Sequence, residues 1–385
     1  MDFDQAIEYH NKALKIRLDL FGEKHPDVAR SYHNLGFAYR DKGDFDQAIG
    51  YYTKALKIWL DLFSEIHPYV ATSYNNLGLA YRDKGDLDQA IEYLNKALKI
   101  RLDLFGEKHP DVAGGYNNLG TVYRQKKDFD QAIAYYDKAL KIQLNLFCEI
   151  HPDVARSYNN LGNAYHDKVD LDQAIDYHNK ALKICLDLFG EIHSDVARSY
   201  NNLGNAYSGK GDLDQAIDYY NRALKIRLEV FGEIHPYVAT SYHNLGGAYH
   251  DKGDLDHAIL YYRKSLNVYD KLFEETNDLI YYMEVAGRHL IIADLFREKR
   301  KRKEAVINLC KGAHRIAESL HFVNAGKLAP ELHLRQVENL FHTAKRLKVI
   351  KNPPDECKES FKKLEGLFNR LKPLDSGLEG KGEKE

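Results

Sequence analysis

The hydrophobic and polar positions of this chain repeat with a period of 42 residues. The period is marked by His-Pro pairs, with one His-Ser pair, at His25-Pro26, His67-Pro68, His109-Pro110, His151-Pro152, His193-Ser194 and His235-Pro236. Between these marks the sequence is nearly constant. A fixed period of this length is typical of stacked repeats, in which each repeat buries its apolar face only against its neighbours. We therefore expect function on a surface to which several repeats contribute.

The first half of each repeat is predicted to be a helix. In residues 26–68, Pro26 suits the first helical position, because its missing N–H needs no partner there. Gly43 is a natural left-handed stop for the same helix. Between them, apolar and aromatic residues recur at spacings of three and four, at Val28, Tyr32, Leu35 and Tyr39.

The second half predicts an antiparallel partner helix that runs to about Phe63. Asp44 is expected to cap its N-terminus, and Gln47 completes something close to a capping box. Its apolar side consists of Ala48, Tyr52, Ala55, Leu56 and Ile58. Small residues stand where the two helices must approach, so a large residue at Ala48 should overpack the repeat by roughly 1–3 kcal/mol.

The turn between the two helices varies among the repeats. Glycine occupies it at Gly43, Gly85, Gly211 and Gly253, whereas Lys127 and Val169 replace it elsewhere. A left-handed conformation is unfavourable for a β-branched residue. We therefore expect the hairpin at Val169 to turn differently or to be looser.

The pattern divides the chain into five parts. Residues 1–24 are a second-type helix without a first helix before it, and their apolar face of Phe3, Ala6, Ile7 and Leu14 needs cover. Residues 25–275 form six tandem repeats. Residues 276–320 fit a degenerate hairpin, residues 321–372 a C-terminal helical cap, and residues 373–385 a disordered tail rich in Gly, Lys and Glu.

The constant residues of the repeat resemble the tetratricopeptide signature W-x2-L-G-x2-Y…A-x3-F…A, with Tyr in both aromatic positions. The matching residues are Tyr32, Leu35, Gly36, Tyr39, Ala48, Tyr52 and Ala55. Leu60 stands where shorter tetratricopeptide repeats have proline, and the longer repeat resembles those of kinesin light chains and the nephrocystin family. The resemblance covers about residues 1–275. It implies an all-α, right-handed α-solenoid (superhelix) of tandem helical hairpins with a degenerate helical cap.

One asparagine occupies the same position in every full repeat, at Asn34, Asn76, Asn118, Asn160, Asn202 and Asn244. The resemblance implies that the first helices line a concave groove and that this position faces the ligand. A carboxamide offers both a donor and an acceptor to the backbone of an extended peptide. A second row precedes it at Asn75, Asn117, Asn159 and Asn201, with His33 and His243 at the ends. Alternatively, some of these amides bond to the neighbouring helix and only maintain stacking.

Two further rows accompany the asparagines. Three positions after them the residue changes from apolar Phe37 and Leu79 to Thr121, Asn163, Asn205 and Gly247. This gradient indicates graded side-chain selection by the groove, or simple drift after duplication. A row of arginines occupies the last turns of three first helices, at Arg40, Arg82 and Arg124. Their charge favours an acidic partner segment. They equally suit the helix dipole.

Catalytic and metal chemistry find no support in the sequence. The repeated histidines are a full repeat apart and cannot converge on one ion, and no metal-ligand spacing occurs. No nucleophile–base arrangement, phosphate loop or cofactor motif is present, so we expect no enzyme and no cofactor. A net charge of −2 does not predict nucleic-acid binding, and no apolar run is long enough to span a membrane.

The cysteine pattern predicts a reducing compartment. Cys148, Cys185, Cys310 and Cys357 have unrelated spacings and no C-x-x-C, so they are interpreted as unpaired thiols of a cytoplasmic protein. The basic run 297–303 is typical either of a charged, solvated turn or of a nuclear import signal.

The sequence therefore predicts a non-catalytic scaffold that binds extended or helical segments of partner proteins. A kinesin-light-chain-like adaptor is one version, although no heptad repeat precedes the array, as a motor-linked adaptor would need. Either the sequence is part of a longer protein or it is a relative without that role. The alternatives are a self-assembling protein that forms homo-oligomers through residues 1–24, and a regulatory domain of a larger signalling protein.

Overall fold

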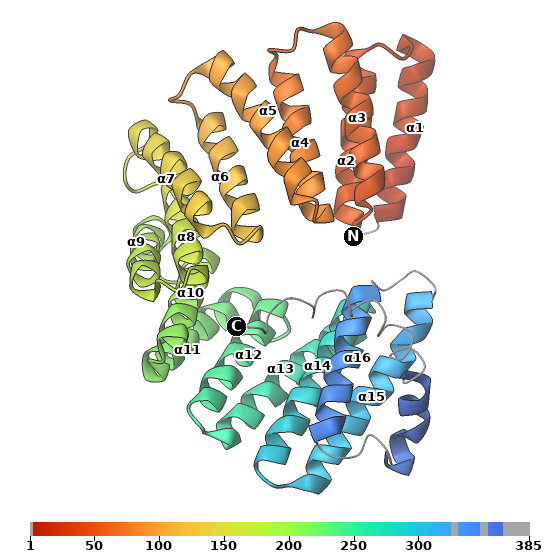
Figure 1. Cartoon of the computed structure of the whole chain (residues 1–385), viewed down its shortest axis with the longest axis vertical. Coiled ribbons are helices and arrows are strands. Elements are labelled where there is room, and N and C mark those ends of the chain that lie inside the picture. Colours follow the sequence, from red (N-terminus) through yellow and green to blue (C-terminus); the bar gives the residue numbers. More distant parts are fainter. Residues whose placement is uncertain (1–2, 325–329, 347–352, 365–385) are drawn as a thin grey trace, which may run out of the picture. The chain divides into compact units, whose positions relative to one another are not determined.

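The computed structural model describes residues 3–324, 330–346 and 353–364, and every regular element in these ranges is a helix (Figure 1). The all-α prediction is confirmed. The chain divides into two compact units, Met1–Gly190 and Glu191–Glu385, each built from consecutive antiparallel helices. The tail predicted at residues 373–385 lies outside the described residues.

We call the helices that open a repeat A helices and those that close it B helices. In the N-terminal unit, B helices and A helices alternate as α1 (Phe3–Phe21), α2 (Pro26–Lys42), α3 (Phe45–Leu62), α4 (Pro68–Lys84), α5 (Leu87–Phe105), α6 (Pro110–Gln125), α7 (Phe129–Leu146), α8 (Pro152–Asp167) and α9 (Leu171–Phe189). The C-terminal unit continues with α10 (Ser194–Lys210), α11 (Leu213–Phe231), α12 (Pro236–Asp251), α13 (Leu255–Thr276), α14 (Leu279–Glu298), α15 (Arg302–Asn324), α16 (Pro330–Arg346) and the 3-10 helix η1 (Asp355–Cys357).

A histidine starts each A helix of the six full repeats. Nδ1 of His25 accepts a hydrogen bond from the backbone N–H of Asp27 at 3.2 Å, and its ring stacks on Phe21 with centroids 4.2 Å apart. His67, His109, His151, His193 and His235 cap their helices in the same way. The repeated histidines are therefore N-caps, which supply an acceptor to an otherwise unsatisfied N–H.

The turn at Val169 corrects our expectation. Val169 has a φ of +66°, close to the +86° of Gly43, and its N–H bonds to the carbonyl of His166 at 2.9 Å. The following Asp170 N–H reaches the carbonyl of Tyr165 at 2.9 Å, as Asp44 reaches Tyr39. The helix pair thus imposes the same left-handed turn on valine as on glycine, against the local preference.

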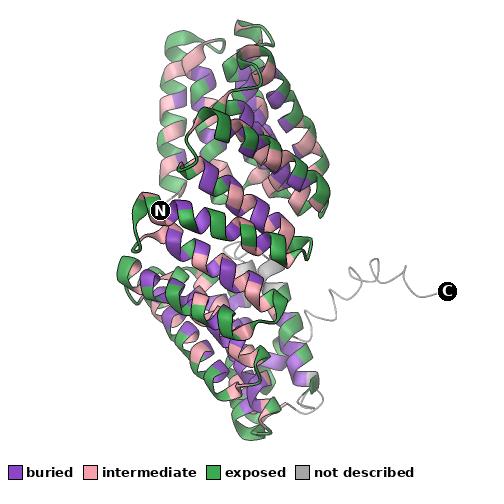
Figure 2. Cartoon of the chain, turned by 90° about the vertical axis from the view of Figure 1, so that its left-hand side faces the viewer, coloured by how far each residue is buried: buried purple, intermediate pink, exposed green. Residues whose placement is uncertain are grey.

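Close approach of the two helices of a repeat depends on small residues. A Cβ added to Gly36 would lie 2.7 Å from the ring of Tyr52, and one added to Gly120 would lie 2.7 Å from the ring of Tyr136. Ala48 and Ala55 are fully buried on the opposing B helix. Buried positions form stripes along the facing sides of the helices (Figure 2). The predicted alternation of small and large side chains is confirmed.

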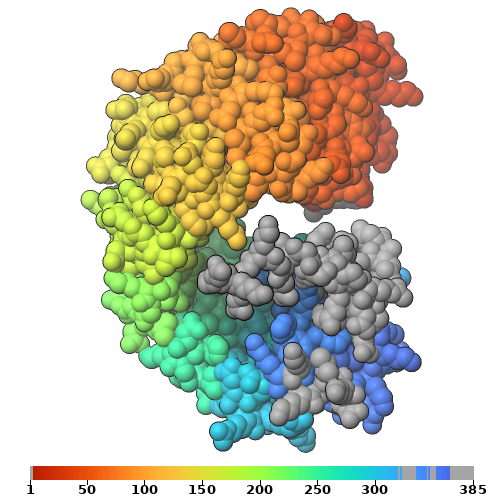
Figure 3. Space-filling model, viewed as in Figure 1, coloured from red at the N-terminus to blue at the C-terminus, as the bar shows by residue number. Residues whose placement is uncertain are grey.

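Helix α1 exposes a different face from the one we predicted. Ile7 and Leu14 are buried, because α1 packs against α2 through them. The exposed apolar side chains are instead Tyr9, Ile16 and Leu20. Helix α1 lies at one end of the N-terminal unit (Figure 3).

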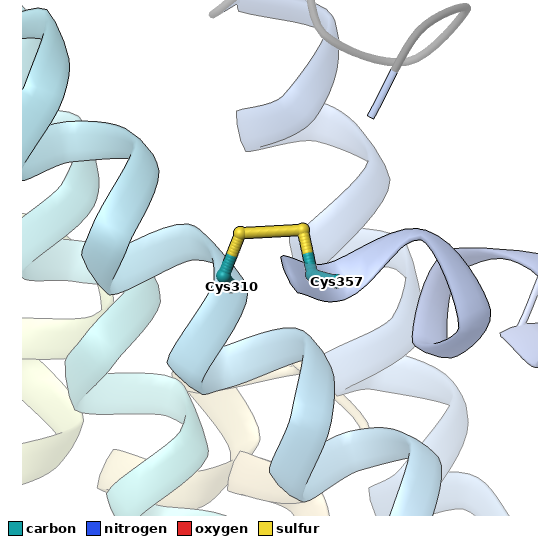
Figure 4. Close-up of a disulfide and its surroundings, with 2 residues drawn as sticks. All are labelled: Cys310 and Cys357. Atoms are coloured by element: carbon teal, nitrogen blue, oxygen red, sulfur yellow. A yellow bond between two sulfur atoms is a disulfide. The ribbon is translucent and has the colours of Figure 1, made fainter. Parts of the chain in front are cut away.

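The C-terminal unit departs from the repeat after α13. Helices α14 and α15 pack as a hairpin whose turn contains Arg300 at a φ of +57°, so part of the basic run forms this turn. Cys310 on α15 and Cys357 in η1 form a disulfide (Figure 4). This corrects the interpretation of all four cysteines as unpaired thiols, while Cys148 and Cys185 are free.

Candidate functional site

The row of predicted asparagines lies on the A helices. Asn34 is exposed, and the other five members are half-exposed. Four belong to the N-terminal unit (Asn34, Asn76, Asn118 and Asn160) and two to the C-terminal unit (Asn202 and Asn244). We call them the Asn row. Their repeated surface position gives each unit one carboxamide per repeat.

The Asn row also links successive repeats. Asn118 donates a hydrogen bond from Nδ2 to Oδ1 of Asn75 at 2.9 Å, and Asn244 donates one to Oδ1 of Asn201 at 3.0 Å. Asn76 Nδ2 lies 3.3 Å from Nδ1 of His33. These contacts support the stacking interpretation at three positions. Within the described residues, however, the Oδ1 atoms of Asn76, Asn118 and Asn244 have no hydrogen-bond donor, so each carboxamide keeps an acceptor for a partner.

The second row of asparagines is mostly buried. Asn75 and Asn201 are each only 9% exposed, and Asn159 is 6% exposed. Their Oδ1 atoms accept bonds from inside the fold, as Asn75 does from Asn118 and from Nη1 of Arg101. Asn117 is half-buried, and its Oδ1 has no hydrogen-bond partner among the described residues. This row therefore offers little surface to a ligand.

Three residues after the Asn row, the type of side chain depends on the B-helix residue that it covers. Thr121 Oγ1 accepts a hydrogen bond from the hydroxyl of Tyr136 at 3.1 Å, and Asn205 Oδ1 accepts one from Tyr220 at 2.8 Å. Phe37 is instead 52% exposed, and the buried hydroxyl beneath it, on Tyr52, has no partner in the described residues. At some repeats the variation thus satisfies a buried hydroxyl, which neither sequence interpretation considered.

The predicted basic row is already paired with carboxylates. Nε of Arg40 lies 2.8 Å from Asp83 of the next repeat, and Nη1 of Arg124 lies 3.4 Å from Asp167 of the next repeat. Arg82 pairs with Asp83 beside it at 2.6 Å. An acidic ligand would have to compete with these carboxylates. The acidic character of the partner stays a prediction.

Sequence reasoning missed a variable position on the B helices, occupied by Arg17, Trp59, Arg101, Gln143, Cys185 and Arg227. Arg227 is 7% exposed and donates to three neutral groups, on Asn201, Tyr237 and Ser241. Burial lowers the pKa of its guanidinium to about 10. The signal for this position was available, since it varies between a constant Ala-Leu-Lys-Ile and a constant leucine in all six helices.

A polar cavity of about 600 Å³ was also missed. It lies in the C-terminal unit between α12, α14 and α16, with His243, Arg288, Asp294, Arg335 and Gln336 in its lining. Arg288 pairs with Glu284 at 2.9 Å, so much of its charge is balanced. No sequence feature indicated the cavity, because α16 lies beyond the repeats.

The described residues contain no group of three or more His, Cys, Asp or Glu side chains placed to hold a metal ion. None of the described helices is both long and apolar enough to cross a membrane.

Two family patterns, both of tetratricopeptide repeats, match this chain. The tetratricopeptide repeat pattern matches at residues 1–61, 69–145, 112–187, 153–229 and 195–271, and a second tetratricopeptide pattern matches at residues 33–103. No curated protein matches the sequence significantly.

Three solved structures illustrate the similarity. BtubC (BKLC) from P. vanneervenii is 28% identical, with a TM-score of 0.53 over 60% of this chain and 93% of that chain. A putative kinesin light chain from Podosopora anserina, with nearly identical TPR-like repeats, is 21% identical, with a TM-score of 0.49 over 54% of this chain and 99% of that one. The apo form of RapI is 18% identical, with a TM-score of 0.48 over 72% and 98%.

The repeat pattern, the paired helices of both units and the family match agree over more than half of the chain. The chain therefore belongs to the tetratricopeptide repeat family.

Proposed function

We propose that this chain is a protein-interaction scaffold that holds an extended or helical segment of a partner protein on its A helices. Tetratricopeptide repeat proteins mediate protein–protein interaction, and their scaffold is typically non-catalytic. The observation that carries the proposal is the Asn row, which repeats a surface carboxamide along the A helices and in which Asn76, Asn118 and Asn244 keep a spare acceptor. A partner's backbone N–H groups can donate to these oxygens without disturbing the bonds between repeats.

Specificity is proposed to come from the first two repeats. Phe37 is 52% exposed and Leu79 is half-exposed, and each lies three residues after a member of the Asn row. Large apolar side chains at an otherwise polar surface are typical anchors for a partner side chain. In this proposal Asn76 and Asn118 bind the partner backbone, while Phe37 and Leu79 select its apolar residues.

The finer role that we propose is that of an adaptor similar to kinesin light chains, acting in the cytoplasm. The 42-residue repeat, which resembles the repeats of kinesin light chains, supports the choice of this role over other scaffold roles. The disulfide between Cys310 and Cys357 removes one argument for a reducing compartment, so the cellular location rests on the proposed role alone.

The proposal is tested by partner capture with matched variants. The intact chain, the triple variant Asn76→Ala, Asn118→Ala, Asn160→Ala and the loop variant Ile66→Ser are used as baits, and each is checked for native helix content. Ile66 is 50% exposed and lies in a loop between repeats. We expect partners that are retained by Ile66→Ser and lost by the triple variant. An identical set of partners for all three baits would exclude the Asn row as the binding surface.

A further inference from the structure

We propose that the cavity between α12, α14 and α16 binds a small polyhydroxylated anion, such as a sugar acid or a sugar phosphate. Its volume of about 600 Å³ lies within the range of roughly 300–1,000 Å³ that is typical of small-molecule sites. The residues in its lining come from the C-terminal unit alone. None of them belongs to the Asn row, so the site goes beyond the proposed function.

Two contacts hold α16 beside α14 and so fix the two main walls of the cavity. The carboxamide of Gln336 packs over Gly287, where an added Cβ would lie 3.0 Å from Nε2 of Gln336. Further along, Oγ1 of Thr343 donates a hydrogen bond to Oδ2 of Asp294 at 3.2 Å. The contacts are about two helical turns apart on each helix, so the two helices run in the same direction. His243 on α12 contributes the third wall.

Two buried polar atoms in the lining favour a ligand with hydroxyl groups. Oε1 of Gln336 and Nδ1 of His243 are buried and have no hydrogen-bond partner among the described residues. Burial, reinforced by the positive charge of Arg288, lowers the pKa of His243 to about 4, so its ring is neutral near pH 7. The carboxamide oxygen only accepts, whereas Nδ1 of a neutral imidazole donates or accepts according to its tautomer. A hydroxyl group does both, so hydroxyl groups of a ligand can satisfy either atom.

The charges of the lining favour an anion. Its three arginines face two carboxylates, and both carboxylates are already paired. Arg288 lies 2.9 Å from Glu284, and Nη1 of Arg346 lies 3.2 Å from Oδ2 of Asp294. Arg335 is exposed on α16 and forms no ion pair with any residue in the described ranges. A carboxylate or phosphate group of the ligand would balance this guanidinium through charge-assisted hydrogen bonds.

Isothermal titration calorimetry of the full chain tests the proposal, with D-gluconate and D-glucose 6-phosphate as probes at up to about 10 mM. We expect saturable binding of at least one of them. The probe that binds shows whether the anionic group is a carboxylate or a phosphate. D-Glucose and inorganic phosphate serve as control probes, because each has only one of the two features. Each control should bind at least about tenfold more weakly.

Two substitutions connect the binding to the cavity. Arg335→Ala removes the unpaired cation at an exposed position. His243→Phe removes Nδ1 and keeps an aromatic ring beside Tyr262, whose centroid lies 5.2 Å from that of His243. Each should weaken binding at least about tenfold. Arg302→Ala is the matched control and should bind as the unchanged chain does, because Arg302 is also exposed but lies on α15 outside the lining.

Three results would overturn the proposal. The first is absence of binding for both probes at the highest concentration. The second is equal affinity for D-glucose or for inorganic phosphate, since hydroxyl groups and charge would then not be recognised together. The third is unchanged affinity in an Arg335→Ala protein whose helix content is native by circular dichroism, which would place the probe elsewhere.

Discussion

Acid should destabilise the fourth repeat through His178. This residue is 1% exposed on α9, packs against Gly162 and has Nδ1 3.2 Å from Oδ1 of Asn159. Burial, reinforced by the nearby His166, lowers the pKa of His178 from 6.5 to about 4. The folded repeat therefore holds the ring neutral at a pH where the unfolded chain already binds a proton.

The sign of the effect follows from proton binding. Between pH 6.5 and pH 4 the unfolded state binds more protons than the folded state, so stability falls as the pH is lowered. The contribution of His178 is fully present above pH 6.5 and is lost as the pH falls through about 4. A pKa shift of this size lowers the free energy of unfolding by about 3 kcal/mol in total, of which about 2 kcal/mol is already lost at pH 5.

The substitution His178→Leu isolates this effect. Leucine is tolerated at the position, since Leu94 occupies it in the second repeat and is only 1% exposed against Gly78. Urea unfolding followed by circular dichroism at pH 7.5 and pH 5.0 should show a smaller acid loss for the variant, by about 2 kcal/mol. His243 and His289, whose pKa values burial also lowers to about 4, remain in both proteins and cancel in the difference. Equal acid losses for the two proteins would refute the reasoning.

Three further substitutions have expected signs. Val169→Gly should raise the free energy of unfolding by about 1 kcal/mol, because Val169 is 76% exposed and held at positive φ. A lower unfolding temperature for the variant would contradict the claim that valine is strained in this turn. On α6, Gly120→Ala should lower the free energy of unfolding by roughly 1–3 kcal/mol through its contact with Tyr136. Gly114→Ala, with open space around it, should raise it by about 0.5–1 kcal/mol. Equal effects of the two substitutions in urea unfolding would exclude the packing explanation. Phe37→Asn should stabilise the first repeat by about 1 kcal/mol, because the new side chain gives the Tyr52 hydroxyl an acceptor, as Asn205 does for Tyr220. The same substitution should weaken partner binding. Unchanged stability would show that the hydroxyl already has another partner.

The helices could be predicted because every local signal agrees with the fold. The Pro at the start, the Asp cap and the apolar spacing in each repeat all indicate the same hairpin. The turn at Val169 differs from the prediction because the packing of α8 on α9 determines it, against the local preference of valine. The face of α1 was mispredicted for a related reason, since Ile7 and Leu14 are covered by α2.

The candidate site could be located from the sequence but not interpreted fully. Repetition alone identified the Asn row, whereas the bonds from Asn118 to Asn75 and from Asn244 to Asn201 depend on how repeats stack. The pairing of Arg40 with Asp83 likewise joins residues of different repeats. The Cys310–Cys357 disulfide and the cavity beside α16 depend on the chain beyond the repeats, where no period guides the prediction.

The central claim is that partners bind on the A helices, and site-specific photo-crosslinking tests it most directly. A photo-reactive amino acid is placed at Phe37 in one protein and at Ile66 in another, because both side chains are about equally exposed, at 52% and 50%. Phe37 lies on α2, while Ile66 lies in the loop before α4. The account predicts that a captured partner becomes crosslinked at position 37 and not at position 66. Crosslinking at position 66 alone would place the partner on the loops and contradict the account.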